Sequence, residues 1–176
     1  MTNEVYSMII RQENPCDYDE VYSVVKTAFA SAKHSDGTEQ DLVVRLRQST
    51  HFIPELSLVA QIDKRIAGHI MFTKAYIGET ALVALAPLSV LPEFQNKGIG
   101  TDLILKGHFI AQKLGYPYCV VLGSETYYPR FGYVPAEKFH IQAPFHVPSD
   151  NFMAIKLIQN ASPVNGTLRY APEFGI

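Results

Sequence analysis

One stretch decides the fold of this chain: Val90-Leu91-Pro92-Glu93-Phe94-Gln95-Asn96-Lys97-Gly98-Ile99-Gly100-Thr101. It reads as the end of a strand, a tight turn and the start of a helix. The apolar run 81–90 is typical of a buried strand, and Pro92 ends the extended pattern. Beyond the turn, apolar residues recur at steps of three and four. This spacing predicts a helix with one buried stripe, formed by Ile99, Leu103, Gly107, Ile110 and Leu114.

The junction of strand, turn and helix is a candidate anion-binding site. The first amides of a helix have no partner within the helix, and the helix dipole places partial positive charge there. Gly98 and Gly100 let a phosphate group approach the backbone, and Lys97 can add a full charge. The spacing matches neither a Walker P-loop nor the dinucleotide fingerprint, whose third glycine is replaced by Leu103. The pattern that remains is Gln-x-x-Gly-x-Gly behind an apolar strand.

A second apolar segment, 118–123, is followed by an aromatic turn that ends in Tyr128-Pro129-Arg130-Phe131-Gly132-Tyr133. The two segments together resemble the acetyl-CoA signature and the Tyr-x-x-(Leu/Phe)-Gly-(Phe/Tyr) motif of the GNAT superfamily of N-acetyltransferases. The resemblance covers residues 81–133. Weaker similarity toward both ends of the chain is like that of the YhbS-like branch of the superfamily.

The order of expected elements favours one α/β (α+β) domain over residues 1–176, with an acetyl-CoA-binding core at about 81–133. Asp17 and Glu20 predict a capping box at the start of the first helix. The order predicts a mixed, mostly antiparallel twisted sheet with helices on both faces, and the resemblance implies a V-shaped opening between the two central strands. Besides the segments already named, the patterns predict strands at 6–11, 56–62, 65–77 and 151–159 and helices at 17–29 and 39–48.

The resemblance implies that acetyl-CoA is the cosubstrate and that the protein uses no metal. The turn would supply amides for the diphosphate of the cofactor. Pro87 has no amide of its own, so a bulge near 87–89 would free backbone groups of Leu88 and Val90 to pair with the pantetheine arm. The predicted cofactor-binding residues are Leu88, Ser89, Val90, Gln95, Asn96, Lys97, Gly98, Ile99, Gly100 and Thr101.

The resemblance assigns catalytic roles to Val90 and Tyr128. The Val90 amide would point at the thioester oxygen and stabilise the negative charge that develops there. The Tyr128 phenol would act as the general acid that meets the departing thiolate. Packing beneath the helix is the alternative role for Tyr128.

The general base stays open. A lysine-like amine has a reference pKa of ~10.4 and must lose a proton before it attacks. Many members of the superfamily carry an acidic residue on the fifth strand, whereas this chain has Val120-Val121-Leu122 there. The open candidates are Glu125, Glu39, Asp36, His34, His69 and a route through water.

The leading hypothesis is an acetyl-CoA-dependent N-acetyltransferase that acts directly on a primary amine of a small molecule or peptide. No Ser-His-Asp or Cys-His pairing is visible in the motif region to suggest a covalent intermediate. One alternative is an acyl-CoA-binding sensor or regulatory protein without turnover. A nucleotide-binding protein of another fold is disfavoured, because the lysine and metal ligands of such sites are missing. The acceptor pocket is expected from loop 31–38, the second helix and segment 139–151.

Composition limits the partners and the location. A net charge of -2 gives no basic field for nucleic acid. No apolar run approaches the ~18 residues of a membrane span, and the first residues do not resemble a signal peptide. Cys16 and Cys119 give neither a disulfide framework nor a metal pattern. We therefore expect a cytoplasmic protein without nucleic-acid or membrane partners, and the resemblance leaves a homodimer open.

Overall fold

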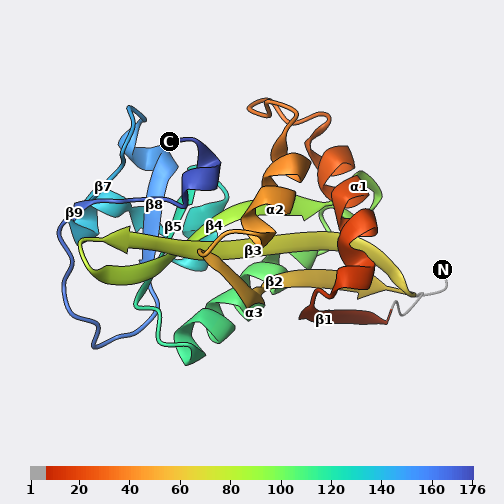
Figure 1. Cartoon of the computed structure of the whole chain (residues 1–176), viewed down its shortest axis with the longest axis horizontal. Helices are drawn as coiled ribbons and strands as arrows, with labels where there is room; N and C mark the ends of the chain where they lie inside the picture. The colour runs from red at the N-terminus through yellow and green to blue at the C-terminus, as the bar shows by residue number, and fades with distance from the viewer. Residues whose placement is uncertain (1–6) are drawn as a thin grey trace.

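The structure is a computed structural model that describes residues 7–176 (Figure 1). Its helices are α1 (Tyr18–Phe29), α2 (Glu39–Arg47) and α3 (Ile99–Lys113). Short 3₁₀ helices fill several connections, among them Pro92–Phe94 and Tyr128–Phe131. The strands are β1 (Met8–Gln12), β2 (Phe52–Ile62), β3 (Arg65–Ile77), β4 (Thr80–Val90), β5 (Tyr118–Leu122), β6 (Val134–Pro135), β7 (Ile141–Gln142), β8 (Phe152–Lys156) and β9 (Gly166–Thr167).

Seven of these strands form one sheet in the order β1-β2-β3-β4-β5-β8-β6. Every neighbouring pair in this sheet is antiparallel except β4 and β5, which are parallel. Strands β7 and β9 form a separate parallel pair. The main sheet is therefore mixed and mostly antiparallel, as the sequence predicts.

Helix α3 covers one face of the sheet, whereas α1 and α2 cover the other (Figure 1). On the α3 side, Leu58 and Phe72 pack in one core cluster with Leu103. On the other side, Val59 and Met71 belong to the core cluster that α1 and α2 complete. Because both faces are covered, β3 is buried almost continuously instead of alternating between buried and exposed residues.

The buried stripe of α3 differs in part from the predicted one. Ile104 and Ala111 join it, and both are completely buried. Leu114 is 46% exposed, because α3 ends at Lys113 and the chain then turns at Gly115, where φ is +89°. The last predicted member of the stripe is thus wrong.

Helix α1 begins where the sequence predicts, but the predicted capping box is also wrong. The Asp17 carboxylate makes no cap hydrogen bond to α1 and instead accepts hydrogen bonds from the Arg11 side chain and the Asn14 amide. Glu20 accepts a hydrogen bond from the amide of Ile66 on β3, at 2.7 Å. Both carboxylates therefore bind groups outside α1 instead of capping the helix. Tyr6, the predicted start of the first strand, lies outside the described residues.

The pairing of β4 with β5 positions the site. It consists of the pairs Val83–Cys119 and Ala84–Val120, although β4 continues to Val90. The register between β3 and β4 shifts by one residue around 86–87, which marks the predicted bulge slightly earlier than expected. Beyond this bulge β4 stays paired with β3 and separates from β5. The V-shaped opening lies at this separation.

Candidate functional site

The end of β4 presents backbone groups toward the opening. The Leu91 amide donates to the Ala67 carbonyl at 2.9 Å, which fixes the phase of the ladder between β3 and β4. Hydrogen-bonded pairs alternate along an antiparallel ladder, so Ser89 and Leu91 bond to β3. The peptide groups of Leu88 and Val90 therefore point toward the side that β5 has left. An extended ligand can pair with them as a strand would.

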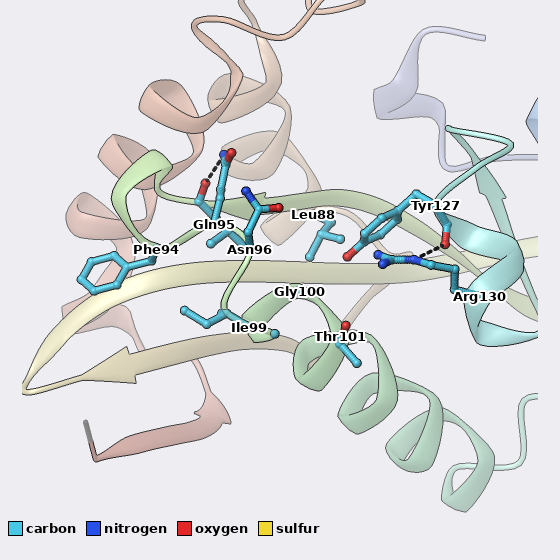
Figure 2. Close-up of a pocket in the computed structure, with 11 residues that line it drawn as sticks. Leu88, Phe94, Gln95, Asn96, Ile99, Gly100, Thr101, Tyr127 and Arg130 are labelled. Atoms are coloured by element: carbon cyan, nitrogen blue, oxygen red, sulfur yellow. Dashed lines mark hydrogen bonds between the residues drawn. The ribbon is translucent and has the colours of Figure 1, made fainter. Parts of the chain in front are cut away.

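Gln95 holds the last peptide of this strand in place. Its side-chain Nε2 donates to the Val90 carbonyl at 3.0 Å, which ties the turn back to β4 (Figure 2). The Val90 carbonyl is thereby occupied, while the Val90 amide keeps its direction toward the opening. The predicted cofactor residue Gln95 thus has a defined positioning role.

A cavity of about 480 Å³ lies between the end of β4, the turn and the start of α3 (Figure 2). Of the predicted cofactor-binding residues, Ser89 and Lys97 do not line it. The Ser89 side chain is only 2% exposed, and the Lys97 ammonium lies 5.4 Å from the centroid of the Phe94 ring. The lining residues that the sequence predicts are Leu88, Val90, Gln95, Asn96, Gly98, Ile99, Gly100 and Thr101.

Three lining residues escaped the prediction: Phe94, Tyr127 and Arg130. Phe94 stands inside the turn that the prediction quotes. Tyr127 and Arg130 stand within or beside the aromatic motif. Their position in or beside these motifs could have indicated a role at the site. The motifs do not show, however, which of their side chains line the cavity.

The start of α3 offers unpaired amides to the cavity. Gly98 is the N-cap and adopts the left-handed conformation, with φ at +84°. The first intrahelical hydrogen bond runs from the Asp102 amide to the Gly98 carbonyl. The amides of the three residues between them have no partner within the helix, and all three residues line the cavity. Together with the helix dipole, these amides make this end of the cavity suitable for a phosphate group.

The two adjacent tyrosines of the aromatic turn take different positions. Tyr127 lines the cavity, and a Cβ added to Gly100 would lie 2.6 Å from its hydroxyl oxygen. Tyr128 is not among the residues that line the cavity; its ring packs where Gly123 has no side chain and makes edge-on contacts with Tyr127 and Tyr133. The Tyr128 hydroxyl has no hydrogen-bond partner among the described residues. Burial raises the pKa of both Tyr127 and Tyr128, so both phenols keep their proton at neutral pH.

Several candidate bases lie around the loop before α2, beside a second cavity of about 370 Å³. Asp36 and Glu39 line this cavity, whereas the exposed His34 does not. Hydrogen bonds from the Thr38 hydroxyl and amide lower the pKa of Asp36. Segment 139–151 borders a third cavity, of about 220 Å³. The segments predicted to form one acceptor pocket therefore border two separate cavities.

The other acidic candidate, Glu125, lies just beyond β5. Its carboxylate accepts a hydrogen bond from Asn151 Nδ2 at 2.8 Å. Neither Glu125 nor any other candidate base lines the cavity beside β4. The general base therefore stays open among the predicted candidates.

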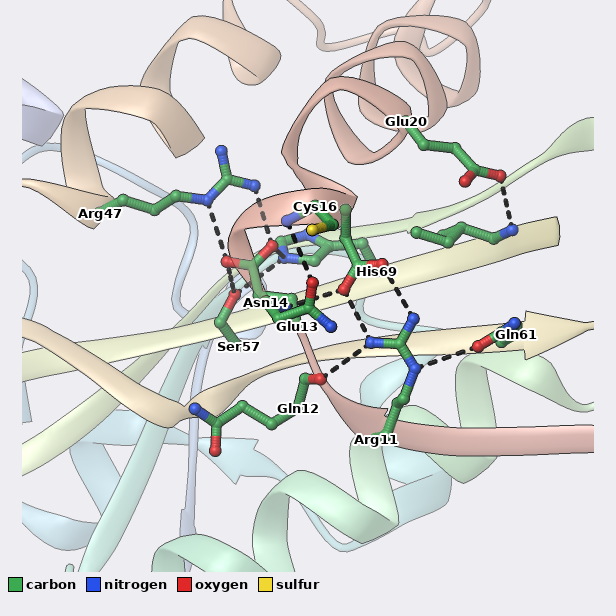
Figure 3. A network of polar contacts seen from close by, with 12 residues as sticks. Arg11, Gln12, Glu13, Asn14, Cys16, Glu20, Arg47, Ser57, Gln61 and His69 are labelled. Carbon is green, nitrogen blue, oxygen red and sulfur yellow. Dashed lines mark hydrogen bonds and ion pairs between the residues drawn. The ribbon is translucent and has the colours of Figure 1, made fainter. Parts of the chain in front are cut away.

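The last candidate, His69, belongs to a buried polar network (Figure 3). Arg47 donates two hydrogen bonds of 2.9 Å to the Glu13 carboxylate. The Ser57 hydroxyl donates to Glu13 at 2.6 Å and lies 3.0 Å from His69 Nε2. Burial lowers the pKa of His69 to about 4, although the negative charge of Glu13 opposes this shift. His69 is therefore neutral at physiological pH.

Ser57, His69 and Glu13 are residue types of a nucleophilic triad, but their arrangement does not form one. Ser57 and His69 are completely buried. Glu13 approaches the same imidazole nitrogen that faces Ser57, at 3.6 Å, and His69 Nδ1 has no hydrogen-bond partner within the described chain. These residues lie outside the motif region, so sequence reasoning had not connected them. The network links β2 and β3 with α2 and supports the structure.

Across residues 7–176, no three or more His, Cys, Asp or Glu side chains are placed to hold a metal ion. The helices of the same range include none that is long and apolar enough to cross a membrane.

Known proteins are similar to this chain in sequence and fold. The model of the acetyltransferase (GNAT) family matches residues 18–133. The N-acetyltransferase YjhQ of Escherichia coli strain K12 is 34% identical over 163 residues, which cover 88% of this chain and 87% of the relative. A crystal structure of a GNAT family acetyltransferase from Brucella melitensis in complex with acetyl-CoA is 32% identical, with a TM-score of 0.80 and coverage of 96% and 98%. The structure of YhbS from Escherichia coli in complex with CoA is 26% identical, with a TM-score of 0.89 and coverage of 100% and 96%.

Proposed function

Because the chain belongs to the GNAT family of acetyltransferases, we propose that it is an acetyl-CoA-dependent N-acetyltransferase that transfers the acetyl group directly to a primary amine. The observation that carries the proposal is the cavity beside β4, where the backbone of Leu88 and Val90 meets the first amides of α3. The free edge of β4 can pair with the amides of the pantetheine arm, and the adjacent start of α3 can bind the diphosphate. These two features match the two parts of coenzyme A. The two similar solved structures hold acetyl-CoA and CoA.

The residues around the opening have separable roles in this proposal. Acetyl-CoA supplies an acetyl group activated as a thioester. The Val90 amide donates to the thioester oxygen, where negative charge develops as the amine attacks. Gln95 binds the Val90 carbonyl, which belongs to the next peptide group, and so holds the end of β4 in place. The Tyr128 hydroxyl gives its proton to the sulfur as the carbon–sulfur bond breaks, and solvent then restores that proton.

The acceptor amine also loses a proton when the new carbon–nitrogen bond forms. Water carries this proton away in our proposal, because none of the candidate bases lines the cavity beside β4. The side chains that can receive it from water are Glu125, Glu39, Asp36, His34 and His69. Among them, the buried His69 is the weakest candidate, since its pKa of about 4 makes it a poor proton acceptor.

We further propose that the chain forms one N-acetyltransferase-like domain whose acetyl-CoA-binding core spans about 81–133. The continuous sheet from β1 to β6 supports this proposal. We also propose that the protein acts in the cytoplasm on a small-molecule or peptide amine. Its free cysteines, Cys16 and Cys119, and its net charge of -2 are consistent with this location and with the absence of a nucleic-acid partner.

A thioester-cleavage assay across a panel of primary amines tests the proposed function. The protein is incubated with acetyl-CoA and amino acids, polyamines or peptides, and the released thiol and the acetylated product are measured. We expect at least one amine to accelerate thiol release and to gain one acetyl group. Binding of acetyl-CoA without turnover on any amine would favour an acyl-CoA sensor instead. Thermal stabilisation by ATP and not by acetyl-CoA would contradict both readings.

A further inference from the structure

Arg130 is the one charged side chain among the described residues that line the cavity beside β4. It belongs to the 3₁₀ helix Tyr128–Phe131, which follows β5. Lys97, the cation that the sequence pattern points to, stands in the turn before α3 but outside the lining. The positive charge that faces the cavity therefore comes from the aromatic turn.

Tyr127 holds Arg130 in position. Arg130 Nε donates to the Tyr127 carbonyl at 3.3 Å, and the guanidinium carbon lies 4.5 Å from the centroid of the Tyr127 ring. The hydroxyl of the same ring lies against Gly100 in the first turn of α3. Figure 2 shows the guanidinium beside this ring, in the space that faces the start of α3. The stacking orders the side chain before any ligand binds, which reduces the entropy lost on binding.

The two terminal nitrogens of Arg130 donate to no residue of the described chain. Among residues 7–176, no carboxylate lines the cavity either, so no anion of this range neutralises the guanidinium there. A guanidinium presents its paired donors in one plane, which matches two oxygens of a phosphate group. An anion placed between Arg130 and α3 meets donors from two sides.

We propose that Arg130 binds the diphosphate of coenzyme A opposite the first amides of α3. This inference rests on the proposed function, because it takes an acyl-CoA as the ligand of the cavity. The diphosphate, and not the 3′-phosphate, is the partner because Tyr127 connects the guanidinium to Gly100, where the helix amides are.

Calorimetric titration with CoA and with dephospho-CoA tests the inference, since dephospho-CoA keeps the diphosphate and lacks the 3′-phosphate. Arg130→Gln is expected to weaken the binding of both ligands by the same factor, about 10- to 100-fold. Arg130→Lys should lose less, because it keeps the charge without the planar pair of donors. Arg130 is exposed, so both variants should keep the unfolding temperature of the unmodified protein.

A control variant separates a local contact from a change in net charge. Arg169→Gln removes an exposed guanidinium whose Nη2 donates to the Gly78 carbonyl. It should change CoA affinity by less than about threefold. The inference is wrong if Arg130→Gln binds CoA normally, or if it loses affinity for CoA but not for dephospho-CoA. If the unmodified protein binds no CoA, the proposed function fails instead.

Discussion

At the scale of single residues, the adjacent tyrosines Tyr127 and Tyr128 have different positions at the site. Tyr127 lines the cavity beside β4, and the Arg130 guanidinium stacks on its ring. Tyr128 packs against Gly123, and its hydroxyl has no hydrogen-bond partner in the described chain. A proton donor with no competing acceptor suits the role of general acid. Because the two rings touch, only substitutions that keep both rings can separate their roles.

Tyr128→Phe removes the hydroxyl and keeps the ring that fills the space beside Gly123. We expect kcat to fall about 100-fold or more, because the departing thiolate loses its proton donor. The affinity for acetyl-CoA should stay within about twofold of the unmodified value, since the residues proposed to bind the phosphates are unchanged. Thiol release gives kcat, and calorimetry gives the affinity.

Tyr127→Phe is the matched control for Tyr128→Phe. It removes the hydroxyl beside Gly100 and keeps the ring on which Arg130 stacks. We expect it to retain most of kcat. A large loss of kcat in Tyr127→Phe, together with normal turnover in Tyr128→Phe, would move the acid role to Tyr127.

At the scale of elements, the close contact between α3 and β3 sets the position of the helix end that faces the cavity. Gly107 makes this approach feasible, because a Cβ there would lie 2.2 Å from a carbon of the Phe72 ring. Phe72 is completely buried in the core cluster on this face. The ring therefore has little room to move away, and the distance between α3 and the sheet depends on a missing side chain.

Gly107→Ala distinguishes this packing from simple helix propensity. In a free helix, alanine would stabilise by about 1 kcal/mol relative to glycine. Here the added methyl group collides with Phe72, so we expect the free energy of unfolding to fall by about 1–3 kcal/mol. Urea unfolding measures it. Leu105→Ala, at an exposed position of the same helix, is the control and should change stability by less than about 0.5 kcal/mol. A stabilised Gly107→Ala would contradict the close approach.

At the scale of the whole molecule, a buried and a partly buried histidine on opposite faces of the sheet couple stability to pH. His69 lies in the network with Glu13, beneath α1 and α2. His108 is on α3, with Nε2 2.7 Å from the Tyr133 hydroxyl. Burial lowers the pKa of each imidazole to about 4. Both are neutral in the folded protein at pH values where the unfolded chain protonates its histidines.

The unfolded state therefore binds more protons than the folded state between the unfolded pKa of about 6.5 and the folded pKa of about 4. Stability should fall as the pH decreases through this window, by up to about 1.4 kcal/mol per pH unit for each histidine. Glu13 acts in the same direction at lower pH. Burial alone would raise its pKa, but Arg47, His69 and Ser57 lower it overall, so its contribution is lost as the carboxylate protonates.

Urea unfolding at about pH 7, 6 and 5 measures this dependence. His108→Gln should reduce the slope by up to one proton, because it removes one of the two titrating groups. His140→Gln, which alters an exposed histidine, is the control and should leave the slope unchanged. An unfolding free energy that is equal at about pH 7 and pH 5 would contradict the role of both His69 and His108.

Local sequence patterns were enough to predict the order of the elements and the anion-binding turn. Glycine conformation and apolar periodicity act over a few neighbouring residues, so they predicted the glycine turn, α3 and the bulge in β4. The resemblance to the GNAT family added the ligand expected for that turn. Most of the residues named for cofactor binding line the cavity for this reason.

Which side chains from distant segments meet depends on the packing of the folded chain. Arg130, and not Lys97, faces the cavity, because its direction depends on stacking against Tyr127. Asp17 and Glu20 do not form the predicted capping box, because their carboxylates accept hydrogen bonds from Arg11 and from the β3 backbone. Local sequence specifies backbone conformation through short-range sterics, whereas a side chain's partner depends on where the fold brings other elements, and that information is spread over the whole chain.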